Sequence, residues 1–599
     1  MLLKNDGQMP EGIIFSDLAK CCENQDAISY ERRLDKWEVL PYETATICGN
    51  MLSAFETVTP PPVKLNVNLT GWHKIYVALF NNPQNNRVFM KLTNDRVESS
   101  FHPEMYPTER RPWWQWENIE ESFWKCADMT GQSVELIKRP GFAMVGSMVA
   151  WLRFVPMTEE EVADWQYERT RTDTKRVFAA CDMFSQYVTH GTEAPEDWLV
   201  LVENLRNTDV EIFSLEQTAD MENFVDAEHG ENYAFFSDMR KKLYYAMLTR
   251  NKGVYKTVMD YAHELGIKIY LGSRMGVSPG VSYPYDGEGC NVAFAKAHMH
   301  MRCRNRDGSF VDSLSFAYPE AQDEIIKRLL DFAAQGCDGI TLIYTRGIPF
   351  VLFEDPVLER FAQQYPDVNP CELPLDDERV KTVHCEIMTE FMRKLRSDVD
   401  AECRRLQIEP LPIHAYVGTS LEDNRMIGLD IEAWAREGLI NSFSAYPLKI
   451  RERLEDVMQK DHPDRIDLAA YTKKCRENFH KIIHRYVEYD RNIELEYVKE
   501  YVDLSHKYNV KVYFELLRQM PDKSYCERAA ALCERGAENF SLWDCDMKAE
   551  IRSEMAAGSR LGHLDDIRNG TLVRNEATLY RILSIGGKNI GIYNPAWLG

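Results

Sequence analysis

Carboxylates that follow short apolar runs are the residues of this sequence best placed to do chemistry. Glu515 is the sharpest example, because it ends the run 510–516, in which every neighbour but Lys511 is apolar or aromatic. An acidic side chain at the end of a buried strand is costly unless it has a partner or a function. We therefore expect Glu515 to be catalytic or to bind substrate. The alternative is a structural ion pair with Arg518 or Arg346.

Three further carboxylates are candidates for the same chemistry. Asp182 and Glu216 follow the apolar runs 176–180 and 210–215, and each could contact substrate or form a salt bridge on a rim. Glu354 lies farther out, on a loop beyond the run 340–343. It is either an acid of the site or a charge at the N-terminus of the helix that follows, where a negative charge is favourable.

Arginines and aromatic residues accompany these carboxylates at the ends of the other runs. We expect a substrate-binding set of Arg274, Tyr344, Arg346, His414, Tyr416, Tyr446, Arg518 and Trp543. Glycoside hydrolysis needs one carboxylate that attacks or activates water and one carboxylic acid that protonates the leaving oxygen. Aromatic faces can stack on sugar rings, and arginine–carboxylate pairing tunes which carboxylate stays ionised. The set therefore predicts a carbohydrate substrate.

Other chemistries find little support in the sequence. His298 and His300 are close in sequence, but only Cys303 is near them and no carboxylate stands at ligand spacing. The sequence has no G-x-S-x-G elbow, and the segment that carries the site residues has no glycine-rich dinucleotide or phosphate motif. We expect neither a metal nor a cofactor.

The elements that must position these residues are eight strand-like runs that alternate with helical patterns over residues 171–570. The runs are 176–180, 210–215, 267–271, 340–343, 411–417, 439–446, 510–516 and 539–543. Short apolar runs between amphipathic helices indicate parallel strands buried on both faces. Eight of them predict a (β/α)₈ TIM barrel, with large insertions after strands two and three, and place the candidate residues at its C-terminal rim.

The preceding residues, 1–165, have a different texture. Runs at 63–69, 72–80, 87–92 and 148–155 read as short strands with Asn, Pro and Gly between them, which is typical of an all-β sandwich. The fold class is therefore α/β, a TIM barrel preceded by an all-β sandwich domain, with residues 571–599 packing back onto a preceding domain. Trp113, Trp114, Trp116 and Trp124 either fill a core or interface or form a sugar platform, and we favour the first.

Composition limits the partners and the compartment. The chain has 94 acidic and 71 basic residues, a net charge of −23, which disfavours nucleic acid and anionic membranes. It has no apolar run of about 18 residues that could span a membrane and no secretory signal. Its 15 cysteines follow no disulfide framework, so we expect a cytoplasmic protein. The aromatic tail at 593–597 permits a homo-oligomer.

Several short motifs resemble the glycoside hydrolase family 10-like group of bacterial (β/α)₈ proteins. In the barrel they are SFAYPEA at 315–321, DGITL at 338–342 with Arg346 beyond it, GLDIEAWAREGL at 428–439 and SRM at 273–275. GWHKIYV at 71–77 and WKCADMTG at 124–131 resemble a sandwich that precedes some of these barrels. The resemblance implies a sugar-acting barrel with Arg346 and Glu515 in its pocket.

The sequence departs from this group's better-known relatives at strand four. Retaining glycosidases of related barrels end that strand with an Asn-Glu pair, whereas this chain has Tyr344, Thr345 and Arg346 there. The acid must then come from Glu354, Glu216 or Asp182. Two alternatives stay open. One is a barrel lyase or isomerase that holds a sugar acid with arginines, and the other is a carbohydrate-binding protein without catalysis.

Overall fold

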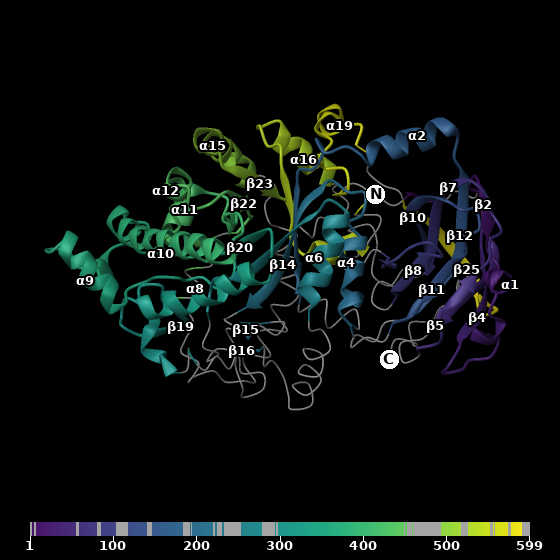
Figure 1. Ribbon diagram of the computed structural model, residues 1–599, viewed down its shortest axis with the longest axis horizontal. Coiled ribbons are helices and arrows are strands. Elements are labelled where there is room, and N and C mark those ends of the chain that lie inside the picture. Colours follow the sequence, from purple (N-terminus) through teal and green to yellow (C-terminus); the bar gives the residue numbers. More distant parts are fainter. Residues whose placement is uncertain are drawn as a thin grey trace.

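The structure is a computed structural model whose described residues lie between residues 3 and 589. Its described residues exclude 5–7, 55–58, 81–85, 104–117, 140–145, 184–191, 193, 220–221, 224–230, 233–252, 278–293, 295–296, 449, 452–453, 455–457, 459–492, 517–524, 551–554, 556–557 and 573–576. Figure 1 shows the barrel elements on one side of the molecule and the N-terminal strands β4, β7 and β12 on the other.

Eight parallel strands between residues 177 and 542 form a closed ring. They are β13 (Val177–Asp182), β14 (Val210–Ala219), β17 (Lys268–Arg274), β20 (Gly339–Ile343), β21 (Ile413–Val417), β22 (Ser442–Ala445), β23 (Lys511–Glu515) and β24 (Phe540–Leu542). Each pairs with the next, and β24 pairs with β13 to close the ring. The predicted (β/α)₈ barrel is confirmed, and all eight apolar runs are barrel strands.

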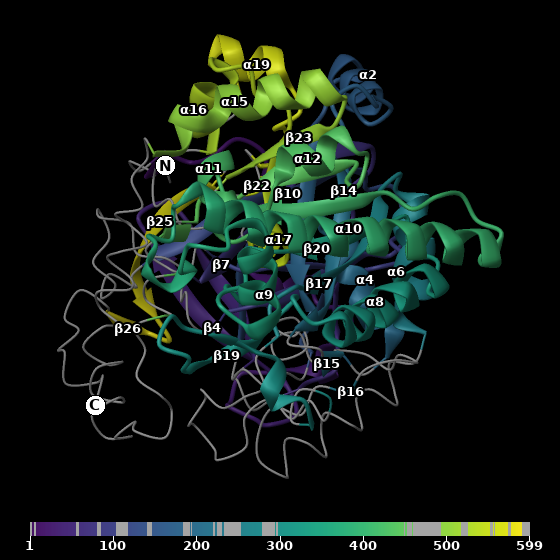
Figure 2. The ribbon, with the colours of Figure 1, turned by 90° about the vertical axis from the view of Figure 1, so that its left-hand side faces the viewer.

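Helices connect successive strands and cover the outside of the ring, and several of them are seen from the side in Figure 2. The main ones are α4 (Leu199–Glu203), α6 (Val254–Glu264), α8 (Pro319–Ala334), α9 (Asp355–Gln364), α10 (Glu378–Leu406), α11 (Leu421–Met426), α12 (Ile431–Arg436), α15 (Ile493–Tyr508), α16 (Tyr525–Cys533), α17 (Cys545–Glu550) and α19 (Leu564–Asn569). A hairpin of β18 (Arg302–Arg304) and β19 (Phe310–Leu314) is inserted between β17 and α8.

Aromatic rings fill the inside of the barrel. Phe178 of β13 stacks on His414 of β21 with ring centroids 3.8 Å apart, and lies 5.4 Å from Tyr513 of β23 and 5.9 Å from Tyr270 of β17. Because side chains on a strand alternate between its two faces, residues two and four positions farther along also face inward. This places the last inward side chain of each strand at the C-terminal mouth of the barrel, where barrel enzymes carry their sites.

The described residues between 8 and 156 are mostly β-strand, as predicted, and with a strand from residues 577–585 they form a second closed ring; the expected sandwich is not confirmed. The six strands of this ring are β4 (Trp37–Thr44), β5 (Cys48–Ala54), β12 (Ser147–Pro156), β7 (Trp72–Phe80), β10 (Asn118–Asp128) and β25 (Ala577–Ile585). Each pairs antiparallel with its neighbours, and β25 closes the ring by pairing with both β10 and β4. One core cluster takes side chains from all six strands, including Trp151 and Tyr580, whose rings lie 4.9 Å apart.

A four-stranded sheet packs against this ring. Its strands are β6 (Val63–Leu65), β11 (Val134–Ile137), β8 (Val88–Leu92) and β9 (Ser99–Phe101). The two sheets share a core that includes Leu65, Met90, Val77 and Leu152. Trp124 belongs to this core and contacts Phe101, which agrees with the interpretation that we favoured for it. Trp113, Trp114 and Trp116 lie outside the described residues.

A buried ion pair joins the four-stranded sheet to the barrel half. Glu550, at the end of α17, lies 2.9 Å from the guanidinium of Arg87 and accepts a 2.6 Å hydrogen bond from the Ser100 hydroxyl. Ser100 accepts a second hydrogen bond from Asn204, which follows α4. Arg87 and Glu550 are 7% and 1% exposed. The pair therefore holds the two halves together without water.

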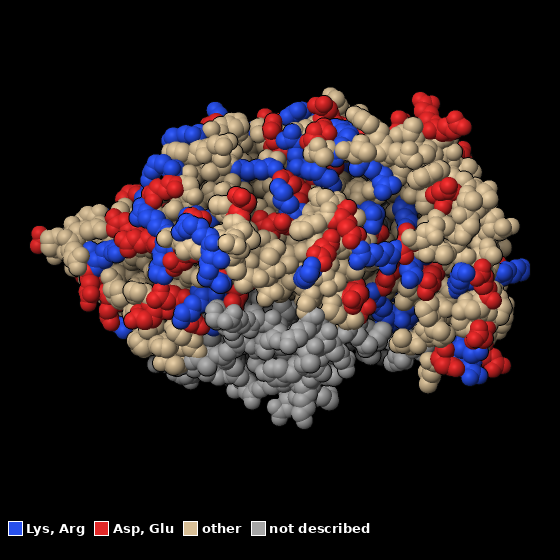
Figure 3. Space-filling view, viewed as in Figure 1, with Lys and Arg blue, Asp and Glu red and all other residues tan. Residues whose placement is uncertain are grey.

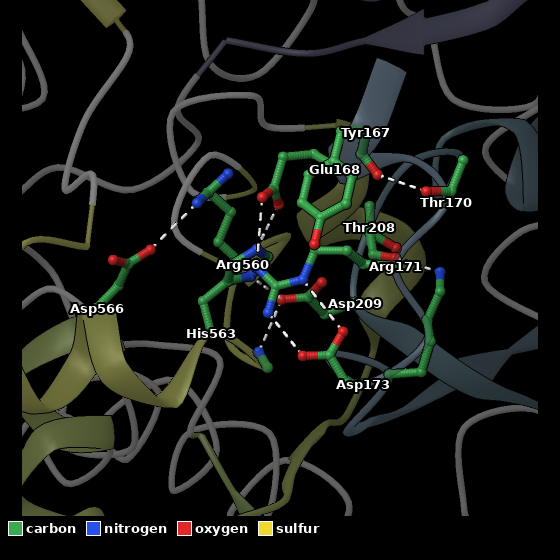
Figure 4. Close-up of polar contacts among 12 residues, drawn as sticks. Tyr167, Glu168, Thr170, Arg171, Asp173, Thr208, Asp209, Arg560, His563 and Asp566 are labelled. Atoms are coloured by element: carbon green, nitrogen blue, oxygen red, sulfur yellow. Dashed lines mark hydrogen bonds and ion pairs between the residues drawn. The ribbon is translucent and has the colours of Figure 1, made fainter. Parts of the chain in front are cut away.

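A histidine clamp ties three distant segments together on the N-terminal side of the barrel strands (Figure 4). The two ring nitrogens of His563 each lie 2.8 Å from a carboxylate, one belonging to Asp209 just before β14 and the other to Glu168. Glu168 ends α2 (Glu159–Glu168), the helix between the two halves of the chain. Both nitrogens can face carboxylates as donors only when the imidazole is protonated.

Stability is expected to fall as the pH rises through the titration of His563. Burial opposes its charge, but the hydrogen bonds to Asp209 and Glu168 outweigh burial and the charge of Arg560, and the pKa of His563 is raised. A group whose pKa is raised by folding stabilises the folded state. That stabilisation is complete at pH values below the pKa of the unfolded chain, which is about 6.5. That stabilisation is lost above the folded pKa. We expect His563→Gln to cost about 2 kcal/mol near pH 6 and much less near pH 9.

Thermal unfolding of wild type and His563→Gln between pH 5.5 and 9.5 measures this difference. His263→Gln is the control, because His263 forms a 2.8 Å pair with Asp338 at a side chain that is 48% exposed, where such pairs contribute little. A wild-type advantage that stays constant with pH would contradict the clamp. The other charged groups near His563, Arg171, Asp173 and Asp566, stay charged over this range.

Figure 3 shows lysines and arginines interspersed with aspartates and glutamates over one face of the molecule. Within the described residues no helix is both long and apolar enough to cross a membrane.

Candidate functional site

Three charged side chains from neighbouring strands meet at the mouth of the barrel. Arg274 ends β17, and its Nε contacts a carboxylate oxygen of Glu216 on β14. Its terminal nitrogen lies 3.6 Å from the carboxylate of Asp182, which ends β13. Asp182, Glu216 and Arg274 each stand four residues beyond an inward-facing core side chain, namely Phe178, Ile212 and Tyr270. The structure thus brings together three of the predicted site residues.

The carboxyl group of Glu216 is poised between its two protonation states at neutral pH. Its side chain is 2% exposed, and burial raises the pKa of Glu216 to about 7. The positive charges of Arg274 and Arg346 act against burial, and the negative charge of Asp182 acts with it. Glu216 can therefore hold a proton at neutral pH and release it to a nearby base, while Arg274 stabilises the anion that remains.

Glu515 ends β23, and both of its carboxylate oxygens are held in place. Ser541 donates its hydroxyl proton to one oxygen over 2.7 Å, and the backbone N–H of Trp543 donates to the other over 2.8 Å. Such donors favour the ionised form of a carboxylate and fix its orientation. The side chain is almost completely buried, at 1% exposure. Glu515 is thus a carboxylate held in a fixed orientation. Two strands, β24 and β13, stand between its strand and β14, which carries Glu216.

Aromatic residues surround Glu515. The ring of Trp543 lies 5.0 Å from that of Tyr416 and 6.0 Å from that of Tyr446. Burial, together with the charge of Glu515, raises the pKa of Tyr416, so its hydroxyl stays protonated. Arg346 extends over the ring of Trp543, with its guanidinium carbon 5.5 Å from the ring centroid. Trp543, Tyr446 and Arg346 thus gather at one place, as the sequence predicted.

Two predicted substrate-binding residues do not reach the mouth. Tyr344 is fully buried outside the ring, where its ring packs against Phe350 and its hydroxyl lies 3.2 Å from the sulfur of Met392. His414 is fully buried deep inside the barrel, below Tyr416, and it contacts the hydroxyls of Ser442 and Ser444. Burial lowers the pKa of His414 well below its usual value. We do not retain either as a substrate-binding residue.

Glu354 is buried in a different cluster from Glu216 and Glu515. It is the N-cap residue of α9, and its carboxylate accepts the backbone N–H of Leu352. Burial raises the pKa of Glu354 to about 7, although hydrogen bonds with Cys303 and Ser315 act in the opposite direction. This placement corresponds to the helix-terminal alternative that the sequence left open. We do not retain Glu354 as a catalytic acid, since its contacts within the described part of the chain are with Cys303, Ser315 and Leu352, away from the mouth.

One predicted substrate-binding residue is not described, and one residue that contacts Glu515 was not predicted. Arg518 lies outside the described residues. Ser541, which holds Glu515, was missed, although it stands two residues before Trp543 and so shares its inward face. Among the residues that the structure describes, no group of three or more His, Cys, Asp or Glu side chains could hold a metal ion.

Comparisons with known proteins give low-identity similarities to solved structures. No family model matches the chain, and no curated protein matches it. The glycoside hydrolase domain of PgaB (BpsB) from Bordetella bronchiseptica is 12% identical with a TM-score of 0.38, over 63% of this chain and 98% of that chain. The catalytic domain of β-amylase from Paenibacillus polymyxa is 9% identical with a TM-score of 0.39, over 66% and 98%.

An α-galactosidase from Thermus thermophilus is 12% identical with a TM-score of 0.33, over 86% of this chain and 92% of that chain. The (β/α)₈ assignment itself rests on the strand pairing of this chain. The resemblance to the family 10-like group stays a prediction.

Proposed function

We propose that the protein is a glycoside hydrolase whose acid is Glu216 and whose second carboxylate is Glu515. The observation that carries this proposal is a contrast between two inward-facing carboxyl groups. Glu216 has a pKa of about 7, whereas Glu515 accepts two hydrogen bonds that favour its ionised form. Pairs of carboxyl groups held in different protonation states are the basis of glycosidase catalysis.

In the proposed reaction, Glu216 gives its proton to the glycosidic oxygen as the bond from that oxygen to the anomeric carbon breaks. Glu515 either attacks the anomeric carbon or removes a proton from the water that does so. The bond electrons leave with the protonated oxygen of the leaving group. Arg274 stabilises the Glu216 anion that forms, and Tyr446, which is only partly buried, offers a ring for a sugar to stack on.

Hydrolysis of a panel of glycosides tests the proposal. We would incubate the purified full chain with α- and β-aryl glycosides and with oligosaccharides between pH 4 and 9, and measure the aryl group or reducing sugar released. Release that Glu515→Gln abolishes supports the proposal. Binding of an oligosaccharide that is never cleaved, at any pH, would instead indicate a carbohydrate-binding protein.

The pH dependence of kcat/KM is expected to show the titration of Glu216. An acid must be protonated to act, so on a substrate with a poor leaving group kcat/KM should fall about tenfold per pH unit above pH 7. A dinitrophenyl glycoside, whose leaving group needs no proton, is the matched control and should lack this fall. Glu216→Gln should remove the fall for the substrate with the poor leaving group and slow its hydrolysis by about 10²- to 10⁴-fold.

The same pH profile for both leaving groups in the wild type would contradict the role of Glu216 as acid.

A further inference from the structure

Arg346 reaches across the mouth of the barrel. It follows β20, which stands opposite β24 in the eight-stranded ring, since four steps separate the two strands in either direction. Its guanidinium carbon nevertheless lies 5.5 Å from the ring centroid of Trp543, which follows β24. Its charge also favours the ionised form of Glu216 on β14. The guanidinium therefore lies between the parts of the mouth that hold the two candidate catalytic carboxylates.

The backbone that carries Arg346 is held firmly. Gly347 has a φ of +77°, and a Cβ on it would lie 2.4 Å from the Cα of Gly276, just beyond β17. The N–H of Met275 donates to the carbonyl of Ile343 over 3.1 Å. Two chain segments thus pack backbone to backbone at this point, which only glycine allows. The position of Arg346 is set by the ends of β17 and β20.

The guanidinium of Arg346 has donors to offer. Arg274 is engaged by Glu216 and Asp182, but Arg346 is exposed, and within the described part of the chain it forms neither an ion pair nor a hydrogen bond. Trp543 beneath it supplies a cation–π contact that orients the planar group without using its N–H donors. A planar guanidinium with free donors matches a carboxylate in two parallel hydrogen bonds.

We propose that the substrate carries a carboxylate on the sugar bound at the barrel mouth, and that Arg346 pairs with it. The substrate class is then a glycoside of a uronic or other acidic sugar. This inference rests on the proposed function. With a net charge of −23, the protein as a whole repels anions. An acidic sugar therefore needs a local partner, and the fixed cation at the mouth provides one.

Matched pairs of substrates test the inference. Each pair has the same aryl group and anomeric configuration and differs only at C6: glucuronide and glucoside, galacturonide and galactoside, mannuronide and mannoside. For at least one pair we expect wild-type kcat/KM to favour the acidic member by about 10²-fold, the range of a charge-assisted bidentate contact. Arg346→Gln should bring that ratio close to one, and Arg346→Lys should restore it only in part.

Arg436→Gln is the control, because it removes one positive charge at a side chain that is 57% exposed on the outer helix α12 and should leave the ratio unchanged. Preference for the neutral member in every pair would overturn the inference. An equal loss on both members in Arg346→Gln would overturn it too, since Arg346 would then act through Glu216. If no glycoside is cleaved, the proposed hydrolase function is contradicted, but the inference about Arg346 is not. That inference is then tested by calorimetry, which compares the binding of glucuronate, galacturonate and mannuronate with that of their neutral sugars in the wild type and in the same variants.

Discussion

Replacing Glu515 by glutamine is expected to lower kcat on the cleaved glycoside by about 10⁴-fold, at the upper end of what a positioned acid or base contributes. Glutamine keeps the shape of the side chain, and its carbonyl oxygen can still accept the N–H of Trp543. The Ser541 hydroxyl can turn to accept from the new amide. The fold should therefore survive, while the negative charge that attacks the anomeric carbon or activates water is lost.

Glu354→Gln is the matched control for this prediction. Glu354 is also fully buried, but it caps α9 among Cys303, Ser315 and Leu352. Its replacement should leave kcat within about threefold of wild type, as for a change outside the reacting groups. Both variants would be compared by steady-state kinetics and by circular dichroism. Normal turnover in Glu515→Gln, or an equal loss in Glu354→Gln, would remove Glu515 from the mechanism.

Removing the carboxylate of Glu550 is expected to cost about 3–5 kcal/mol of stability, because it takes an opposite charge away from the buried guanidinium of Arg87. In Glu550→Ala the guanidinium of Arg87, which is 7% exposed, loses its 2.9 Å contact, and the hydroxyl of Ser100 loses its acceptor. Scanning calorimetry of the full chain would show a lower transition temperature.

The double variant Arg87→Met/Glu550→Leu separates charge burial from simple loss of packing. Two apolar side chains of similar volume can replace a buried ion pair with little loss of stability. We expect the double variant to be more stable than Glu550→Ala alone. A double variant that is as unstable as the sum of the single changes would mean that shape, rather than charge, holds the two halves together.

The barrel could be predicted because its strands are short, apolar on both faces and separated by helices, so each one is visible locally in the sequence. The residues at the mouth could be predicted for the same reason. Glu216 and Glu515 are charged side chains at the C-terminal ends of such runs, where they stand out from the mainly apolar residues before them. Period-two alternation would also have found Ser541, two positions before Trp543.

Other placements depend on contacts that a single run does not show. Tyr344 directly follows Ile343, which faces the inside of the barrel, so Tyr344 points outward and packs under the helices. The polar hydroxyl of Tyr344 was the only reason to expect this residue at the mouth of the barrel. His414 was predicted to lie at the strand end, but it stands three residues before Val417, where the predicted strand does end, so it lies deep in the ring. The position of β25 in the N-terminal ring depends on pairing with residues from the other end of the chain.

That pairing has a consequence for how the protein is made. Ile582 pairs with Thr44, and Thr578 pairs with Glu121, so nearly the whole chain must leave the ribosome before the first ring can close. Until then β10 and the 42–44 end of β4 each present an unpaired edge, the feature of a sheet most prone to join another chain. The barrel, whose strands pair mainly with near neighbours in sequence, can form while the ring is still open. Synthesis thus completes the N-terminal half last, and a chain that stops before Ala577 carries two exposed strand edges instead of a shortened tail.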